Sequence, residues 1–412
     1  MGYRKYIEKG PMPSREEMKC FLRQKINFSR RYEVVDLYQA IDKVAAEDIK
    51  AQTVLPKQPV SKMDGIGVRF ADFADGIPDT KSWTEGKEYV FANTGCVVPN
   101  GYDTVILIED VRFEDGKLCI LQRPERKGQL IDTIGSLIGK DEVLVYKYEK
   151  ITPPLLGLLA SGGVKTVKII AKPKIAFLPT GNELISWQNN DYPADKNVES
   201  NSMMLYGFAK QYQADLKIYP IVPDDKEAIK EALTKASQEA DIILINAGSS
   251  KGTKDFTLDL LEVQGEVFVY ELGCRPGKHS SFSVFNNKPV LGIAGPPNGA
   301  ELAMRFYLKS IVEEYYNQSE CITDKVKTVV DFDFTAPSNA DFCLQVHIFM
   351  RDEKYHAIYI NPKAVTRSTL LHKYNAFMYL SKGCSLVKGQ EFTAELIVNK
   401  KDILSDKYNE DF

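Results

Sequence analysis

The spacing of apolar residues predicts a layered α/β structure for residues 173–317. Short apolar runs at 174–180, 216–222, 241–248, 266–272 and 288–295 have the length and composition of buried strands. Amphipathic stretches at 200–212, 225–238, 255–263 and 300–316 alternate with them and have the spacing of helices. Apolar strands that alternate with amphipathic helices are typical of a mainly parallel sheet covered on both faces. We therefore expect a three-layer α/β domain.

Two other stretches have the alternation of β-strands. Residues 49–142 hold several short strand patterns, and Asp115-Gly116 between two of them predicts a tight hairpin. Residues 318–412 alternate apolar and polar positions over five runs, which predicts a compact β-barrel or sandwich.

The remaining residues, 1–48 and 143–172, predict helices with recognisable ends. Ser14 and Glu17 have the spacing of a capping box, and a second helix is expected over 35–46. Thr152 and Pro153 begin a further helix that Gly162 ends. We expect 1–48 and 143–172 to form one elongated α+β domain into which 49–142 is inserted, followed by domains at 173–317 and 318–412.

Composition argues against a nucleic-acid-binding protein, a membrane protein and a disulfide-rich or zinc-ribbon protein. The chain has 412 residues, 26% charged residues and a net charge of -3, so no basic surface for nucleic acid is expected. It has no signal peptide and no apolar run long enough for a membrane span, which predicts a soluble cytoplasmic protein. Seven cysteines without a CxxC pair argue against a disulfide framework or a zinc ribbon.

Two loops in the 49–142 region offer polar groups for chemistry. Asp64 lies in the turn of SKMDGIGVR, and Thr94 lies in the turn of NTGCVVPNG. Each motif alone fits a plain turn better than a site, because Asp-Gly and Thr-Gly turns are common.

Acidic residues follow two of the predicted parallel strands. Glu183 stands in LPTGNEL, where it could hold a metal or a ligand donor, or simply complement a helix dipole. Asp224 precedes Asp225, which is expected near a helix cap. Ligands of such sheets bind outside the carboxyl ends of the strands, so these loops should gather on one rim.

The segment 246–255, NAGSSKGTKD, gives the strongest signal of anion binding. Glycines and hydroxyls after a buried strand expose backbone N–H groups that suit a phosphate. Asp255 at its end is either an N-cap acid or a Mg²⁺ ligand. The segment lacks the GxxxxGK[ST] pattern of a P-loop.

Two cations flank a Pro-Gly turn in RPGKHSS. Arg275 and Lys278 suit a phosphate or a tetrahedral oxyanion such as molybdate, although a solvated turn would look the same.

Taken in order, these segments resemble the signature of the molybdopterin molybdenumtransferase family, MoeA and the gephyrin E domain. SKMDGIGVR is similar to SAMDGYAVR, and NTGCVVPNGYDTVILIED to TGAPLPxGADAVVxxED. LPTGNEL resembles STGDEL, and NAGSSKGTKD resembles GGVSVGxxD. RPGKHSSF followed by GIAGPPNGA resembles KPGKPxxF followed by GLPGNPVSA.

The resemblance implies a homodimer of four-domain chains whose third domain is similar to MogA, the molybdopterin adenylyltransferase, a possible partner. It implies Mg²⁺-assisted insertion of molybdate into adenylylated molybdopterin (molybdopterin-AMP), with release of AMP. Asp64 and Thr94 would act with the acids of the partner subunit, and Glu183 and Asp255 would hold the metal. The carried-over catalytic positions are Asp64, Thr94, Glu183, Asp224 and Asp255; the substrate-binding positions are Gly248, Ser249, Ser250, Gly252, Arg275, Lys278 and Pro297.

The chain departs from the family pattern where the family binds anions. Asp132 stands at the position of an arginine, Glu271 at that of a lysine, and Gly299 at that of a serine. His279 replaces a proline. Three readings therefore stay open: a divergent molybdenumtransferase, a non-catalytic paralogue that binds a pterin or nucleotide or acts as a scaffold, and an enzyme that acts on tungstate.

Overall fold

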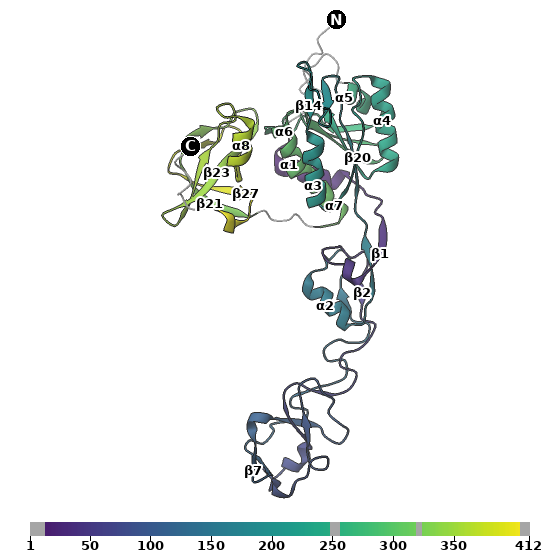
Figure 1. Ribbon diagram of the computed structural model, residues 1–412, viewed down its shortest axis with the longest axis vertical. Helices are drawn as coiled ribbons and strands as arrows, with labels where there is room; N and C mark the ends of the chain where they lie inside the picture. Colours follow the sequence, from purple (N-terminus) through teal and green to yellow (C-terminus); the bar gives the residue numbers. More distant parts are fainter. Residues whose placement is uncertain (1–12, 248–255, 319–323, 404–412) are drawn as a thin grey trace. The chain divides into compact units, whose positions relative to one another are not determined.

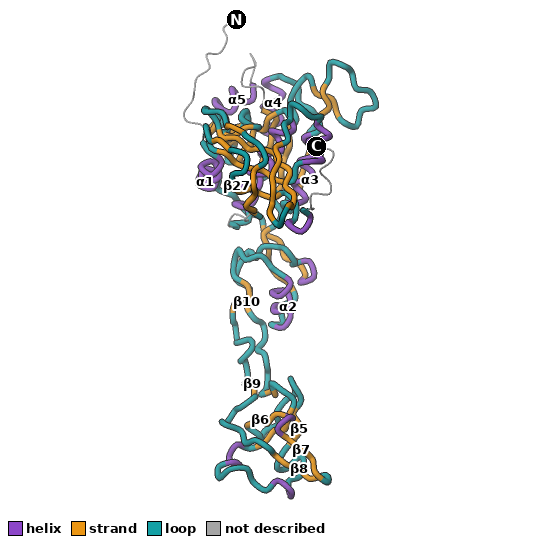
Figure 2. The backbone as a smooth tube through the Cα atoms, turned by 90° about the vertical axis from the view of Figure 1, so that its left-hand side faces the viewer, coloured by secondary structure: helices purple, strands orange, loops and turns teal. Residues whose placement is uncertain are grey.

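A computed structural model describes residues 13–247, 256–318 and 324–403 of the chain (Figures 1 and 2). It divides into two compact units: residues 32–170 form one, and the residues on either side of that stretch form the other. Within the described residues, no helix is both long and apolar enough to cross a bilayer.

A six-stranded sheet forms the centre of the unit that lies outside residues 32–170. Four of its strands are parallel: β15 (Asp215–Ile218), β12 (Lys174–Leu178), β16 (Ile242–Ala247) and β20 (Lys288–Ala294). β19 (Ser281–Phe285), antiparallel to β20, and β17 (Glu266–Val269), antiparallel to β19, complete it. The predicted mainly parallel sheet is thus confirmed, and the carboxyl ends of four strands share one rim.

Helices cover both faces of this sheet (Figure 1). Alternate residues of β12 divide between two cores: Ile175 and Phe177 pack with one helix layer, and Ala176 and Leu178 with the other. The first layer holds α1 (Arg15–Lys25), α3 (Asn201–Gln211) and the successive segments α6 (Pro297–Leu302), a π-helical turn (Ala303–Leu308) and α7 (Lys309–Tyr315). The second layer holds α4 (Lys226–Glu239) and α5 (Phe256–Gln264).

A closed five-stranded barrel follows in the same unit. β23 (Asp341–Arg351), β24 (Lys354–Tyr359), β21 (Lys325–Val330), β27 (Glu391–Leu396) and β25 (Ala376–Leu380) pair in that order, and β25 pairs back with β23. The short strand β18 (Cys274–Arg275) also pairs with β23, so the loop before Lys278 is attached to the barrel wall. Smaller elements are β13 (Leu184–Ser186), β14 (Asn197–Glu199), β22 (Phe334–Thr335), β26 (Ser385–Leu386), α8 (Arg367–Lys373) and a 3-10 turn (Lys400–Asp402).

The unit formed by residues 32–170 consists of short strands, one α-helix and a few 3-10 turns. β1 (Tyr32–Asp36) pairs with β11 (Thr166–Ile170), and β2 (Ile49–Lys50) pairs with β10 (Val143–Val145) beside α2 (Pro153–Ser161). Further along the chain, β4 (Gly65–Val68) lies between β5 (Val90–Ala92) and β6 (Thr104–Leu107). The rest are β3 (Val60–Ser61), β9 (Ile131–Asp132), β7 (Val111–Glu114), β8 (Lys117–Ile120) and 3-10 turns at Leu37–Gln39, Phe70–Phe73, Thr80–Ser82 and Ile108–Asp110.

Local sequence signals had mixed success. The Ser14 capping box, the Asp115-Gly116 hairpin and the helix after Thr152 are confirmed. The helix expected over 35–46 is wrong: the chain forms strand β1 there, followed by a 3-10 turn. The pairing of β1 with β11, which lies some 130 residues later in the chain, overrides the local pattern.

Candidate active site

The turn that carries Asp64 is fixed by the glycine that follows it. A Cβ on Gly65 would lie 2.0 Å from the carbonyl oxygen of Ile106 on the neighbouring strand, so only glycine fits. The Ile108 N–H donates to the Asp64 carbonyl oxygen over 3.0 Å and holds the other side of the turn. The Asp-Gly dipeptide is therefore a packing requirement that also places the Asp64 carboxylate on the surface.

Asp64 and Thr94 are in direct contact. Both the backbone N–H and the hydroxyl of Thr94 donate to Oδ1 of Asp64, at 2.7 and 2.9 Å. These bonds, the backbone one first, lower the pKa of the Asp64 carboxyl below its ordinary value. The result is an exposed carboxylate that stays ionised and is held in one orientation by Thr94.

Asp132, which stands where the family has an arginine, is engaged in an ion pair nearby. Nζ of Lys62, the residue that follows β3, lies 3.0 Å from Oδ1 of Asp132, and β3 pairs with β9. Lys62 itself departs from the family motif, which has alanine there. The charge of Asp132 is thus balanced by Lys62, two residues before Asp64.

Glu183 and Asp224 lie on the rim of the large sheet, on loops joined through Asn182. The backbone N–H of Asn182 donates to Oδ2 of Asp224 over 3.1 Å, and the Asp224 N–H donates to Oδ1 of Asn182 over 3.2 Å. Gly181 has a φ of 139°, and a Cβ there would lie 2.6 Å from a carboxylate oxygen of Glu183. Glycine at 181 thus lets the Glu183 carboxylate fold back over the end of β12.

The segment predicted to bind anions lies almost entirely outside the described residues. Gly248, Ser249, Ser250, Gly252 and Asp255 all belong to the stretch 248–255. At its border, the buried Oδ1 of Asn246 has no hydrogen-bond partner among the described residues. In the parts of the chain that are described, no three acidic, His or Cys side chains converge to hold a metal ion.

Of the two predicted cations, Lys278 is already paired. Nζ of Lys278 lies 3.1 Å from Oε2 of Glu271, and Nδ1 of His279 lies 3.3 Å from Oε1 of the same carboxylate. Glu271 and His279, which differ from the family pattern, thus form one cluster with Lys278, which matches it. Arg275 is partly exposed and lines the same side of the pocket described below.

Gly299 has a steric explanation. A Cβ on Gly299 would lie 3.0 Å from Cα of Gly277, whose φ of 103° brings the Pro-Gly turn onto the start of α6. A serine at position 299 would press on this turn. Pro297 is the first residue of α6, where its missing N–H costs nothing, and it is partly exposed.

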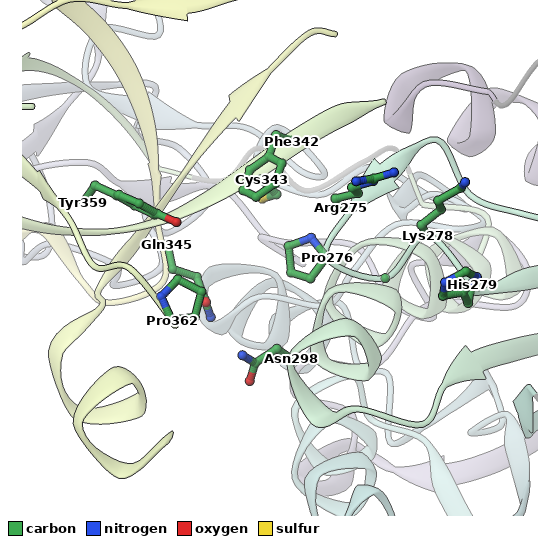
Figure 3. Close-up of a pocket in the computed structure, with 11 residues that line it drawn as sticks. Arg275, Pro276, Lys278, His279, Asn298, Phe342, Cys343, Gln345, Tyr359 and Pro362 are labelled. Carbon is green, nitrogen blue, oxygen red and sulfur yellow. The ribbon is translucent and has the colours of Figure 1, made fainter. Parts of the chain in front are cut away.

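A pocket of about 480 Å³ opens between this turn and the barrel (Figure 3). Figure 3 shows Arg275, Lys278 and His279 on one side and Tyr359, Gln345 and Pro362 on the other. Its remaining lining residues are Pro276, Gly277, Asn298, Phe342 and Cys343. No sequence motif indicated that the barrel lines this pocket, because Gln345 and Tyr359 stand in ordinary strand patterns.

Comparisons with known proteins cover most of the chain. Residues 13–163 match the family model for the MoeA N-terminal region (domain I and II), and residues 176–314 match that of a probable molybdopterin binding domain. The fold is similar to the crystal structure of a molybdopterin biosynthesis MoeA protein from Pyrococcus horikoshii, with a TM-score of 0.74 and 23% identity; the match covers 94% of this chain and all of that one.

Curated relatives agree with the fold. A protein of Methanocaldococcus jannaschii named for molybdopterin biosynthesis is 30% identical over 304 residues, which are 70% of this chain and 76% of that protein. The molybdopterin molybdenumtransferase of Haemophilus influenzae is 27% identical over 310 residues, which are 72% of this chain and 76% of the enzyme. The two family models and these relatives match the parts of the chain that carry the motifs described above. The chain belongs to the MoeA family of molybdenum cofactor biosynthesis proteins.

Proposed function

We propose that this protein is a molybdopterin molybdenumtransferase that inserts molybdenum from molybdate into adenylylated molybdopterin and releases AMP. The observation that supports this activity best is the Asp64–Thr94 pair, an exposed carboxylate held by two hydrogen bonds and kept ionised. A carboxylate in this state can orient a water molecule or a metal-bound water for cleavage of a phosphoanhydride.

In this proposal the acids on the sheet rim act on the pyrophosphate of the substrate. Glu183 and Asp224 are exposed at the carboxyl ends of parallel strands, where ligands of such folds bind. Glu183 and Asp255 would hold Mg²⁺ with phosphate oxygens and water, a donor set that Mg²⁺ favours. When bound, the metal would neutralise charge on the departing phosphate.

The anionic groups of the substrates would bind on the cationic side. Arg275 offers a planar guanidinium for a phosphate or molybdate oxygen pair. Lys278 would have to leave Glu271 or share its protons between Glu271 and the anion. The backbone N–H groups of Gly248, Ser249, Ser250 and Gly252 would complete the cradle, with Pro297 at its edge.

The test is AMP release by the purified protein with adenylylated molybdopterin, molybdate and Mg²⁺. We expect turnover in the wild type, its loss in Asp64→Asn, and its dependence on Mg²⁺. Asp255→Ala should also abolish turnover without loss of folding. Binding of the substrate with no AMP above background would reject the transferase activity, and tungstate in place of molybdate shows whether the site separates the two oxyanions.

The ion pairs of Glu271 with Lys278 and His279 favour a second candidate function, that of a non-catalytic binding protein. A lysine neutralised by a neighbouring carboxylate binds anions less well than a free one, and a paralogue that only binds a pterin nucleotide or a partner protein would tolerate this. Such a protein would bind the substrate without releasing AMP. The substitution Glu271→Lys, which restores the family residue, should then raise affinity for molybdate.

We further propose that the protein is a cytoplasmic homodimer in which Asp64 and Thr94 of one copy act with the acids of the second copy. Support comes from the family resemblance and from the exposure of Asp64 and Thr94. A molybdopterin adenylyltransferase is the expected supplier of the substrate, because adenylylated molybdopterin is the product of such a reaction.

A further inference from the structure

A second pocket opens where the helices of the α/β domain meet the barrel. Its volume is about 330 Å³, at the lower end of the range of small-molecule sites. One side of its wall comes from α1, the end of α3, the π-helical turn and α7, and the other side comes from β21, β25 and β27. The described residues that line it are all different from those that line the pocket of Arg275. The two pockets can therefore hold different ligands.

The helix that follows β20 presents a row of charged side chains to this pocket. Arg305, Lys309 and Glu313 stand four residues apart, and all three line it. On a regular α-helix, positions four residues apart drift around the axis by about 40° at each step. The wider π-helical turn at Ala303–Leu308 reduces the drift between Arg305 and Lys309. Such turns are rare, and they are frequent at functional sites.

Cationic side chains outnumber acidic ones in the wall of this pocket. Three lining residues are glutamates, and five are cations: Arg15, Lys19, Arg305, Lys309 and Lys325. One of the glutamates, Glu395, accepts hydrogen bonds from Arg15 over 2.6 and 2.9 Å and also lies 3.7 Å from Nζ of Lys325. Cations stay in excess even when Glu301, which pairs with Arg305 from outside the wall, is included. The pocket therefore favours an anion.

Arg305 has hydrogen-bond donors left for such an anion. Its Nη2 donates to Oε1 of Glu301 over 2.8 Å, while its buried Nε has no hydrogen-bond partner among the described residues. Its Cζ lies 5.1 Å from the ring centre of Phe208 and 5.7 Å from that of Phe377, so the planar group is held against two rings. A guanidinium has five N–H donors, and buried donors in proteins are nearly always bonded. An oxyanion in the pocket would supply acceptors for them.

The rest of the wall is largely apolar. Phe306 and Phe377 meet edge to face with their ring centres 5.9 Å apart, and Leu396 and Ile397 line the barrel side. A bare inorganic ion would leave these surfaces in contact with water, whereas an anion on an apolar body would bury them. The combination of a cationic and an apolar wall thus suits an organic anion.

We propose that this pocket is a second ligand site, which binds a small organic anion with a phosphate or carboxylate group, and that Arg305 holds the oxygen atoms of that group. The ligand would touch the helices and the barrel strands at once, so its binding should also hold the barrel more firmly against the α/β domain. The inference goes beyond the proposed function, because none of the residues that line this pocket belongs to the candidate active site.

The test measures binding of phenyl phosphate to the full-length protein by calorimetry. Inorganic phosphate, which lacks the ring, should bind more weakly, and benzyl alcohol, which lacks the charge, should not bind. Arg305→Lys keeps the charge but loses the guanidinium fork, and it should weaken phenyl phosphate binding about tenfold. Phenyl phosphate should raise the unfolding temperature of the wild type more than that of Arg305→Lys.

Lys309→Gln is a second variant that leaves the pair of Arg305 and Glu301 intact, so it serves if Arg305→Lys does not fold. It should weaken phenyl phosphate binding by a smaller factor, because Nζ of Lys309 lies 3.6 Å from Oε1 of Glu313 and its charge is partly balanced. The matched control is Lys235→Gln on the exposed face of α4, which should leave binding unchanged.

Arg275→Ala distinguishes the two pockets. If phenyl phosphate also binds beside Arg275, this variant should remove that binding event and leave the other in place. Binding that is lost in Arg275→Ala but unchanged in both Arg305→Lys and Lys309→Gln would belong to the other pocket and would overturn the inference. So would equal binding of benzyl alcohol and phenyl phosphate, or no binding of phenyl phosphate by the wild type. None of these outcomes depends on AMP release.

Discussion

The Asp64 carboxyl has a lowered pKa because Thr94 donates two hydrogen bonds to its ionised form. Thr94→Val removes the hydroxyl bond and keeps the backbone bond. We expect the pKa of Asp64 to rise partway towards its ordinary value, so that the carboxylate is lost at a higher pH as acid is added. The ¹³C chemical shift of the Asp64 carboxyl during a pH titration measures this directly.

The control is Thr94→Ser, which keeps the hydroxyl and should keep the low pKa. An unchanged titration in Thr94→Val would show that the backbone N–H alone holds the carboxylate. The hydroxyl would then have no part in keeping Asp64 ionised.

A second prediction concerns the tight contact between Gly299 and Gly277. Gly299→Ser restores the family residue, but its Cβ would lie 3.0 Å from Cα of Gly277 and 3.1 Å from Cβ of Ala294. Overpacking of this kind costs about 1–3 kcal/mol in the free energy of unfolding. Urea unfolding should show the loss, while Gly295→Ser, with no atom within 4 Å of the added Cβ, should stay near the wild type. Equal stability of the two variants would mean that the turn gives way freely.

At this scale the sequence predicts what is decided by near neighbours. Ser14 and Glu17 are three residues apart and form the capping box that their spacing predicts. The contact of Gly277 with Gly299 and the bond of Tyr374 to Glu301 join residues from separate elements. No local pattern signals such contacts, so the loss of the family serine at 299 could be seen from the sequence but not explained.

At the scale of elements, the two adjacent acids before α4 have different expected roles: Asp225 caps the helix, and Asp224 is the candidate site residue. Asp225 is the N-cap of α4, and its Oδ1 accepts from the Ala228 N–H over 2.9 Å. Asp225→Ala should therefore lower the free energy of unfolding by about 1 kcal/mol and leave AMP release unchanged. Asp224→Ala should reduce AMP release, because the proposal places Asp224 at the pyrophosphate.

Asp225→Asn is the control, since asparagine caps a helix about as well as aspartate. The measurements are chemical unfolding and the AMP assay on the same preparations. Loss of activity in Asp225→Asn with full stability would move the functional acid from position 224 to position 225.

The elements that the sequence predicted correctly are those with a strong period of their own. Ile229, Leu233 and Ala236 lie on one face of α4 and are buried, as the apolar spacing requires. Strand β1 is different: Glu33 and Val34 are exposed, and its partner strand comes after the whole 49–142 region. A strand held mainly by a distant partner carries too weak a local signal to be distinguished from a helix.

At the scale of the whole molecule, the candidate residues are divided between the two compact units. Asp64 and Thr94 belong to residues 32–170, and Glu183, Asp224 and Arg275 belong to the other unit. The order of motifs along the sequence indicated the family, but the sequence alone does not show which copy of the chain supplies each group. A mixing experiment can answer that question.

Asp64→Ala and Glu183→Ala are each expected to be inactive in the AMP assay. If each site takes Asp64 from one copy and Glu183 from the other, a mixed dimer has one intact site and one with both changes. Random exchange at equal amounts makes about half of the dimers mixed, so about a quarter of wild-type activity should return. If each site is built within one chain, every site in a mixed dimer carries one change and no activity returns.

Mixing Asp64→Ala with Asp64→Asn must stay inactive in both cases, which controls for residual turnover. No recovery after exchange that mass spectrometry shows to be complete would exclude the shared site.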